Sequence, residues 1–367
     1  MVSKMDERMF DDHPHIHVMD LRYGENPHQD DATLFMDISY KGPSIATARQ
    51  IHGEKELSYN NILDSDAGLR AILEFKEETA VCVIKHYGER GFATGPSGRE
   101  AFLKAYYGNE YDSYGGVVAS TVPLDAEMMK ATRGKFIEVI VAPYFTEEAL
   151  DVLNKRLERE EKKDNTRKWR NCRLLELGDL TKPEPQSIYR QILGGVLTQS
   201  ENIELFGSGV TGADLKSVTG IEPTVPPGLI EFAYKVLKHM ISNKALVARS
   251  YISEGKEYYQ LIGEGEGQGA RVDASQLAVT RARKFFEREA KSLNILPTND
   301  YIDGQMSTCI FATGAFFAKV DGPQTVYRAG IRNTVCPFGS KEDENVIAFS
   351  KEHGIAMLDG RLRHFKH

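Results

Sequence analysis

The sequence lacks several features that would place it in a simple class. No apolar run approaches the roughly 18–20 residues that a membrane helix needs, and the most apolar tract, Cys309 to Val320, is short and contains Lys319. Residues 1–17 are polar and acidic, without the apolar centre of a signal peptide. Only four cysteines occur in 367 residues, far apart and without a CxxC pair. These absences predict a cytoplasmic protein with reduced thiols and no membrane partner.

An excess of positive charge is also missing. The formal net charge is −7, which argues against non-specific nucleic-acid binding because that requires a basic surface. A local arginine cluster for a small anion stays compatible with this balance. Several catalytic signatures are absent too. There is no GxxxxGK[ST] of P-loop ATPases, no HxE with PCxxC of zinc deaminases, no HExxH and no GxSxG.

The order of apolar segments predicts an α/β protein. Hydrophobic residues make up 41% and charged residues 27% of the chain, as in ordinary globular proteins. Strand-like and helix-like segments alternate from about residue 60 to residue 177, and again after a stretch rich in Pro and Gly at 178–228. We therefore expect two α/β units. The predicted division is a flexible leader at 1–19, a first domain at 20–200 and a second at 201–367.

Two N-terminal segments carry polar side chains of interest. The HPHIH segment at 13–17 could ligate a metal, but it has no acidic or cysteine partner at motif spacing, which favours a solvated tail. The RYGENPHQ segment, Arg22 to Gln29, surrounds a Gly and a Pro with hydrogen-bonding side chains. Gly allows close backbone approach and Pro fixes a turn. The segment is either a ligand-binding loop or an ordinary connection.

Two further segments lie around the first predicted buried strand. ELSYNNILDSDAG, residues 56–68, precedes a helix, so its Asp64 or Asp66 could simply cap that helix. Lys85 and His86 lie side by side at the end of the predicted strand 80–86. Strand ends of open α/β sheets commonly hold ligands. A Lys can neutralise developing negative charge and a His can move protons near neutral pH, but the pair could equally mark a strand entering solvent.

Two C-terminal segments are candidates for binding anions. GEGEGQGAR, Gly263 to Arg271, fits a dinucleotide fingerprint only loosely, since no clean βαβ unit with a ribose-binding acid follows. A backbone nest with Gln268 and Arg271 as polar arms is the alternative. The basic terminus GRLRHFKH, residues 360–367, is either a frayed tail or a phosphate clamp, because Arg matches phosphate oxygens in a bidentate fashion.

Taken together, these motifs resemble those of one family, the AICAR transformylases, which form half of the bifunctional AICAR transformylase/IMP cyclohydrolase. The resemblance runs in order from about residue 20 to residue 367. Its elements are RYGENPHQ, LSYNNILDSDA, IKH at 84–86, EVIVAPYFTEEAL, SNK at 242–244, GEGQGAR, FFAKVD and RLRHF.

The resemblance implies a fold, an assembly and a reaction. The fold would be two tandem cytidine-deaminase-like α/β/α units without the deaminase zinc site, and the assembly a homodimer with active sites at the subunit interface. The reaction would be formyl transfer from 10-formyltetrahydrofolate to the 5-amino group of AICAR, giving FAICAR in purine biosynthesis. Because few residues precede RYG, IMP cyclohydrolase activity is expected to be absent. Some relatives hold a structural monovalent cation, for which the sequence shows no recognisable ligand set.

Residue roles are likewise implied by the resemblance. His86 would assist proton removal from the amine, and Lys85 would stabilise the tetrahedral oxyanion or help protonate N10 of the leaving folate. The nucleotide side would comprise Arg22, Tyr23, Gly115, Glu138, Asn243, Arg271, Phe316 and Arg363. The folate side would comprise Gln268, Phe317, Lys319 and Asp321.

Departures from the family pattern keep two alternatives open. Ala318 and Lys319 stand where the family has a Pro–Phe wall against the folate, Glu138 replaces an Asp, and YGERGFATG follows Lys85–His86 without the early Pro. The donor could therefore be a modified pterin. The chain could also be a non-catalytic AICAR-binding paralogue, although retention of both Lys85 and His86 argues against that.

Overall fold

A computed structural model of the chain describes residues 7–10, 13–162, 169–181 and 183–367. The chain divides into two compact units, with the boundary between Pro183 and Glu184. The sequence predicted a first domain ending at 200. The observed division instead assigns the hairpin of β10 (Ser187–Ile192) and β11 (Gly195–Ser200) to the second unit.

The first unit is built around a mixed sheet with strand order β6-β5-β7-β8-β9-β4. Strand β5 pairs antiparallel with β6 and β7, whereas β7, β8 and β9 run parallel. A separate antiparallel sheet joins β1, β2 and β3. The elements of this unit are β1 (Glu7–Phe10), β2 (His13–Asp20), β3 (Thr33–Asp37), η1 (Ile45–Thr47), β4 (Arg49–His52), α1 (Tyr59–Leu73), β5 (Ala80–Lys85), β6 (Gly88–Thr94), α2 (Gly98–Gly108), α3 (Glu110–Ser113), β7 (Gly116–Ser120), α4 (Ala126–Ala131), β8 (Ile137–Ala142), α5 (Glu147–Lys162) and β9 (Arg173–Glu176).

The second unit repeats this plan with strand order β13-β12-β14-β15-β16. Strand β12 pairs antiparallel with β13 and β14, and β14, β15 and β16 are parallel. Beyond the β10–β11 hairpin, its elements are η2 (Gly212–Asp214), α6 (Pro227–His239), β12 (Ala245–Ser253), β13 (Lys256–Gly265), α7 (Arg271–Ser292), α8 (Asn299–Ser307), β14 (Ile310–Thr313), α9 (Asp321–Arg328), β15 (Asn333–Cys336), α10 (Asp343–Glu352) and β16 (Ala356–Asp359).

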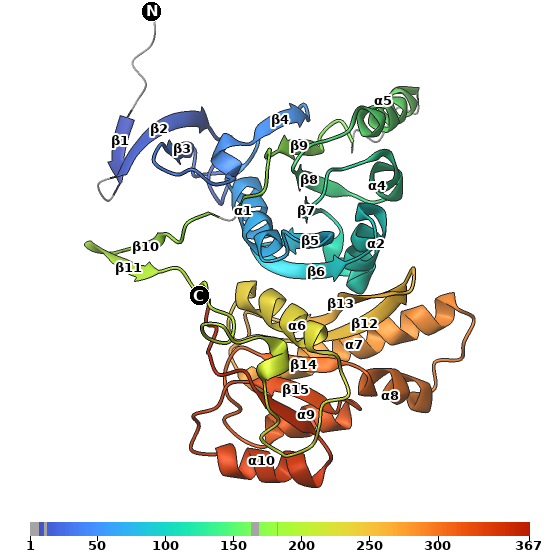
Figure 1. Cartoon of the computed structure of the whole chain (residues 1–367). Coiled ribbons are helices and arrows are strands. Elements are labelled where there is room, and N and C mark those ends of the chain that lie inside the picture. The colour runs from blue at the N-terminus through green and yellow to red at the C-terminus, as the bar shows by residue number, and fades with distance from the viewer. Residues whose placement is uncertain (1–6, 11–12, 163–168, 182) are drawn as a thin grey trace, which may run out of the picture. The chain divides into compact units, whose positions relative to one another are not determined.

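Helices cover both faces of each main sheet (Figure 1). In β5, Val81 and Val83 join the core beneath α2, α4 and α5. Their neighbour Cys82 faces α1, where Gly68 lets the helix approach the sheet: a Cβ on this glycine would lie 3.0 Å from the Cβ of Ala119. Alternation along a strand thus supplies two apolar faces. The predicted α/β class is confirmed.

Helix starts show where local sequence signals succeed and fail. Ser97 caps α2 as predicted, because its hydroxyl accepts from the Glu100 N–H at 3.3 Å. The prediction that Asp64 or Asp66 caps the first helix is wrong. Helix α1 begins earlier, at a capping box in which Ser58 and Asn61 exchange side-chain-to-backbone hydrogen bonds of 3.2 Å. Asp64 therefore lies inside the helix and is free for another task.

The expected flexible leader is also corrected. Residues 13–20 form β2, which pairs with β1 and β3, while residues 1–6 and 11–12 lie outside the described part of the chain. In the HPHIH segment, the ring of His17 contacts the carboxylate of Asp20 at 2.9 Å. Across the described residues, no group of three or more His, Cys, Asp or Glu side chains is placed to hold a metal ion.

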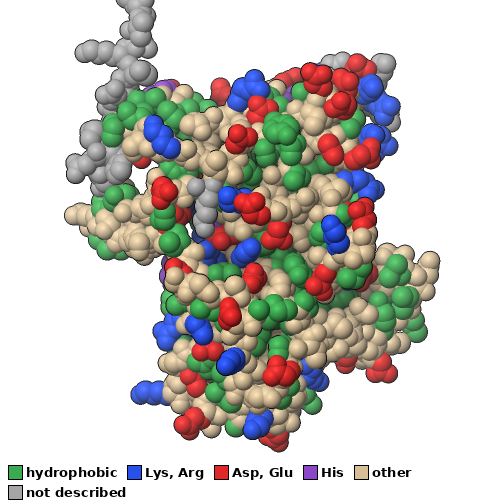
Figure 2. Space-filling view, viewed as in Figure 1, with side chains coloured by type: hydrophobic (Ala, Val, Ile, Leu, Met, Phe, Trp, Pro, Cys, Tyr) green, Lys and Arg blue, Asp and Glu red, His purple; other side chains and the backbone are tan. Residues whose placement is uncertain are grey.

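Two further observations concern the surface and helix lengths. Figure 2 shows acidic and basic side chains intermixed over one face of the molecule, without a continuous basic area on that face. Within the described ranges, every helix is too short or too polar to cross a membrane.

Candidate functional site

Lys85 and His86 lie at a two-residue hairpin turn between β5 and β6. Lys85 pairs with Gly88 across the hairpin, so His86 and Tyr87 form the turn itself. Both have positive φ angles, 55° and 62°. Two-residue turns with positive φ at both central positions normally use Asn-Gly or Gly-Gly. A His–Tyr pair there is strained, and such strain is found most often at functional sites.

Asp64, from the second turn of α1, holds this hairpin turn. Its Oδ1 accepts from the Tyr87 N–H at 2.6 Å and its Oδ2 accepts from the His86 N–H at 3.2 Å. Burial raises the pKa of the Asp64 carboxyl, and these two hydrogen bonds oppose the rise. These two hydrogen bonds to one carboxylate therefore offset part of the cost of the strained backbone. They also hold the backbone of His86 in a fixed orientation at the end of the sheet.

Lys85 is held beside a cavity of about 690 Å³. Its Nζ donates to the carbonyl oxygen of Tyr114 at 2.8 Å, which occupies one of the three N–H groups of the ammonium. The residues that line the cavity are Lys85, Tyr106, Tyr107, Glu110, Tyr111, Tyr114, Arg133, Gly134 and Lys135.

The lining of this cavity combines aromatic rings with positive charge. Lys135 lies 4.9 Å from the ring centroid of Tyr107 and 5.2 Å from that of Tyr106. Lys135 and Arg133 form no ion pair within the described part of the chain, and Glu110 is the one carboxylate in the lining. Tyr111 is 90% exposed. Exposed rings beside uncompensated cations suit a planar aromatic ligand that carries negative charge.

Gly115 is the last residue before β7 and directly follows Tyr114, which lines this cavity. Its φ is +76°, its N–H donates to the carbonyl oxygen of Phe136 at 2.8 Å, and an added Cβ would lie 3.3 Å from the Phe136 ring. A side chain here would be strained and crowded. Glycine thus permits the loop to turn tightly into β7 close to Lys85.

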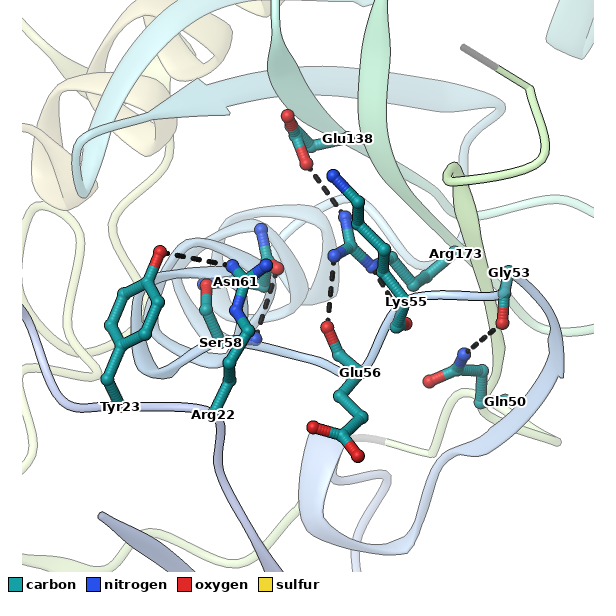
Figure 3. A network of polar contacts seen from close by, with 10 residues as sticks. All are labelled: Arg22, Tyr23, Gln50, Gly53, Lys55, Glu56, Ser58, Asn61, Glu138 and Arg173. Carbon is teal, nitrogen blue, oxygen red and sulfur yellow. Dashed lines mark hydrogen bonds and ion pairs between the residues drawn. The ribbon is translucent and has the colours of Figure 1, made fainter. Parts of the chain in front are cut away.

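Arg22 and Tyr23 lie beside the N-terminus of α1 (Figure 3). The Arg22 guanidinium donates to the Tyr23 hydroxyl at 3.1 Å and lies 4.7 Å from the centre of its ring. Asn60 ties the RYGENPHQ loop to the helix by donating to the Glu25 carbonyl at 3.2 Å. Arg22 is exposed and pairs with no carboxylate among the described residues. An unpaired cation at a helix N-terminus is suited to a phosphate.

Glu138 is held by a buried arginine in the same network (Figure 3). Its Oε2 accepts from Arg173 Nη1 at 2.7 Å. Arg173 is 1% exposed and also donates to the carbonyl oxygens of Lys55 and Glu56, at 3.3 and 3.0 Å. The guanidinium is thus largely satisfied, and the Glu138 carboxylate, 35% exposed, is fixed in orientation with acceptor capacity left over.

In the second unit, Arg271 and Arg363 flank the ring of Phe316. Their guanidinium carbons lie 4.5 and 4.6 Å from its centroid, and Arg271 also donates to the Phe316 carbonyl at 3.1 Å. Burial, followed by the charge of Arg363, lowers the pKa of Arg271. Neither guanidinium pairs with a carboxylate in the described ranges. Two like charges without a counterion form a site for an anion.

Asn243 and Gln268 form the neighbouring part of this unit. The Asn243 amide donates to the carbonyl oxygens of Gln268 and Gly269, at 3.0 and 3.1 Å. Two backbone hydrogen bonds of 3.3 Å join the same pair. The Gln268 amide folds back onto the Glu266 carbonyl at 2.9 Å. The glycine-rich segment is therefore anchored by Asn243 directly before Arg271 begins α7.

The residues expected on the folate side differ in accessibility. Phe317 is 5% exposed and packs against Phe311 in the core, with ring centroids 6.2 Å apart. Lys319 and Asp321 are exposed, and Asp321 Oδ1 accepts from the Gly322 N–H at 2.8 Å. Exposure leaves Lys319 and Asp321 available to a ligand, whereas Phe317 supports the loop from beneath.

The predicted residues are thus distributed over both units. Lys85, His86 and Gly115 lie together in the first unit, and Arg271, Phe316 and Arg363 lie together in the second. Sequence reasoning did not identify Asp64 as the support of the turn, nor Arg173 as the partner of Glu138. An arginine inside the apolar strand NCRLLEL was the available signal for Arg173.

Comparison with known proteins places the chain in a family. The family model described as "AICARFT/IMPCHase bienzyme" matches residues 4–281. The chain is similar to bifunctional purine biosynthesis proteins PurH, with 35% identity over 348 residues to that of Persephonella marina and 37% over 349 to that of Halalkalibacterium halodurans. It is 36% identical over 351 residues to that of Brucella ovis.

These matches cover 95% of this chain but only 58–59% of the length of those three relatives. The extent of the match and the level of identity show that the chain belongs to the AICARFT/IMPCHase bienzyme family of purine-biosynthesis enzymes.

Proposed function

We propose that this chain transfers a formyl group from 10-formyltetrahydrofolate to the 5-amino group of AICAR, giving FAICAR and tetrahydrofolate in purine biosynthesis. The observation that carries the proposal is the His86–Tyr87 turn, strained at both residues and held by Asp64 beside Lys85. Family membership supplies the reaction class, and PurH proteins are named for purine biosynthesis.

The reaction needs a base and an acid. The 5-amino group is a poor nucleophile because its lone pair is delocalised into the imidazole and carboxamide. As the N–C bond to the formyl carbon forms, this nitrogen must lose a proton, and we assign that proton to His86. The bond from the formyl carbon to N10 of the folate then breaks, and N10 takes up a proton. Lys85, with two N–H groups not used by Tyr114, stabilises the intermediate oxyanion or supplies this proton.

Substrate binding is proposed for the remaining groups. Arg22, Tyr23 and Arg363 would contact the nucleotide, with the arginines at its phosphate, while Asn243 and Arg271 would hold the base or its carboxamide beside Phe316. Gly115 and Glu138 would lie at the nucleotide. The orientation of Glu138 by Arg173 supports a role as a fixed acceptor. The donor would lie near Gln268, Lys319 and Asp321, with Phe317 beneath the loop. The aromatic, cationic cavity next to Lys85 would suit a planar, negatively charged part of either substrate.

We also propose that both units are cytidine-deaminase-like and that the chain acts as a cytoplasmic homodimer with sites at the subunit interface. The repeated strand order supports the first point. The β10–β11 hairpin supports the second, because a two-stranded hairpin is marginal by itself. Its strands are exposed throughout and present apolar side chains that a second copy could cover, namely Ile188, Tyr189, Ile192, Leu193, Val196 and Leu197.

The deciding experiment is a turnover assay with a purified polypeptide of these 367 residues, AICAR and 10-formyltetrahydrofolate, following tetrahydrofolate and FAICAR. Turnover without IMP above background is expected, because the match covers only part of the bifunctional relatives. Turnover only with another pterin donor would favour the modified-donor alternative. Tight AICAR binding without turnover for any donor would favour a binding paralogue and reject the proposal.

A further inference from the structure

The second unit contains a buried lysine, Lys244, to which the proposed reaction assigns no role. Lys244 lies between α6 and β12 and is 3% exposed. Its Nζ donates to the carbonyl oxygen of Met240 at 2.8 Å and to that of Lys238 at 3.3 Å. No carboxylate in the described part of the chain forms an ion pair with it. A buried ammonium normally has a carboxylate partner, so one held by backbone carbonyls alone needs an explanation.

The carbonyls around this ammonium come from the end of a helix. Lys238 belongs to the last turn of α6, and Met240 is its C-cap. The last carbonyls of a helix have no partner within the helix and carry partial negative charge, which favours a cation. The Lys244 ammonium therefore supplies positive charge inside this helix end, and Lys366 Nζ adds a second charge by donating to the His239 carbonyl at 2.8 Å.

The opposite wall is built from the end of β14 and the C-terminal tail. A Cβ on Gly314 would lie 2.7 Å from Lys244 Cε and 2.9 Å from the His364 carbonyl oxygen, so glycine leaves the room that the lysine fills. The His364 N–H donates to the Gly314 carbonyl at 3.0 Å. Ser242 and Lys366 exchange hydrogen bonds of 2.8 and 3.1 Å that fasten the tail nearby. The lysine thus lies where three segments converge.

We propose that the Lys244 ammonium is a tethered cation that takes the place of a free structural monovalent cation in this chain. Monovalent cations are bound by backbone carbonyl oxygens, the group that surrounds Nζ here. A free cation does not fit, because the lysine chain fills the space and its charge would repel a second cation. Tethering also removes the loss of translational freedom that a free ion incurs on binding. The inference is independent of the proposed catalytic function.

The protonation state sets the conditions for the test. Burial and, after it, the nearby Lys366 charge lower the pKa of Lys244 to about 7, and the Glu266 charge opposes this change. At pH 6.5 the ammonium form prevails. Thermal unfolding of the full chain is measured there at equal ionic strength in potassium, ammonium and choline chloride. Choline is too large to enter the space between the carbonyls.

The wild-type melting temperature is expected to be the same in all three salts. Lys244→Ser vacates the ammonium position and leaves the carbonyls, so it should melt at least about 4 °C lower in choline and regain much of this in potassium or ammonium. Lys244→Met fills the space without charge and should melt lower in every salt, without recovery. Lys256→Ser, at an exposed lysine of β13, is the matched control and should behave as wild type.

Three results would overturn the proposal. Wild-type protein that is stabilised by potassium over choline would show that a free cation is still bound. Lys244→Met as stable as wild type would show that the charge is not needed. A folded Lys244→Ser without any salt response would show that the carbonyls do not form a cation site. If Lys244→Ser does not fold, the salt response of the wild type and the stability of Lys244→Met decide between the alternatives.

Discussion

The two units share a strand order but differ at the same hairpin. In the first unit, β5 and β6 are joined by His86–Tyr87, and in the second, β12 and β13 are joined by Glu254–Gly255. All four residues have positive φ. Glu254–Gly255 has a glycine in one of the two positions, as this turn prefers, and is exposed to solvent. His86–Tyr87 has none and needs the carboxylate of Asp64.

We expect this difference to separate the chemical step from part of the nucleotide binding. The first unit uses a strained turn to present His86 next to Lys85, whereas the second presents two guanidiniums around Phe316. Because the strand plan is the same, the difference must come from residues at strand ends and loops rather than from the fold. The comparison predicts rate effects at the His86–Tyr87 turn and affinity effects at Arg271 and Arg363.

The largest effect is expected at the turn. His86→Ala should lower turnover on the order of 10²-fold or more with little change in AICAR affinity, because general acid–base groups contribute that much. Glu254→Ala, at the corresponding turn of the second unit, is the matched control and should leave turnover unchanged. Steady-state kinetics and AICAR titration measure both. Equal turnover of His86→Ala and wild type would show that the first hairpin has no catalytic role that the second lacks.

The stability of the second unit should depend on pH through His364 in its C-terminal tail. His364 is fully buried, its ring bonded to the Leu205 carbonyl at 2.9 Å and the Asn202 amide at 3.0 Å. Burial, opposed by the Leu205 hydrogen bond and reinforced by the charges of Lys244, Lys238 and His239, lowers the pKa of His364 to about 4. As pH falls, His364 therefore takes up a proton at a higher pH in the unfolded state than in the folded state. The contribution of His364 to stability is complete above pH 6.5 and falls by about 3 kcal/mol as pH drops to 4.

Urea unfolding at several pH values measures this loss. His364→Gln should flatten the stability curve between pH 6.5 and 4, whereas His28→Gln, at an exposed histidine of the first unit, should leave its slope unchanged. Parallel curves for His364→Gln and wild type would show that the tail histidine does not control the acid response.

Part of the binding energy for AICAR should come from Arg363 of the second unit. Arg363→Ala should weaken AICAR binding by roughly 1.5–3 kcal/mol if its guanidinium donates to the phosphate, and should affect the dephosphorylated nucleoside little. Arg361→Ala, two residues earlier in the same exposed tail, is the matched control. Calorimetric titration measures both ligands. A similar loss for nucleotide and nucleoside would remove the phosphate from this role.

Strands and helix caps that depend on residues close together in the chain could be predicted from the sequence. The Ser97 cap follows from a short pattern and is confirmed, and the strand predicted at 80–86 is confirmed over 80–85. The conformation of His86–Tyr87 could not be predicted, because its support, Asp64, lies 22 residues away from His86 in the chain. The burial of Lys244 likewise depends on Gly314 and on the tail. Both are tertiary effects that override local preference.

The smallest effect concerns the donor at the loop of Lys319. A flexible cation stands where the family sets an aromatic ring, and an aromatic contact contributes about 0.5–1.5 kcal/mol beyond its area burial. Lys319 is exposed and can reach an anionic group of the donor. Monoglutamyl 10-formyltetrahydrofolate should therefore show a raised KM, and polyglutamyl donors should do better, with an advantage that shrinks at high salt. Lys319→Phe should narrow this gap, whereas Lys341→Phe, at another exposed lysine of the second unit, should not. Tight and salt-insensitive use of the monoglutamyl donor by the wild type would show that Lys319 has no bearing on donor choice.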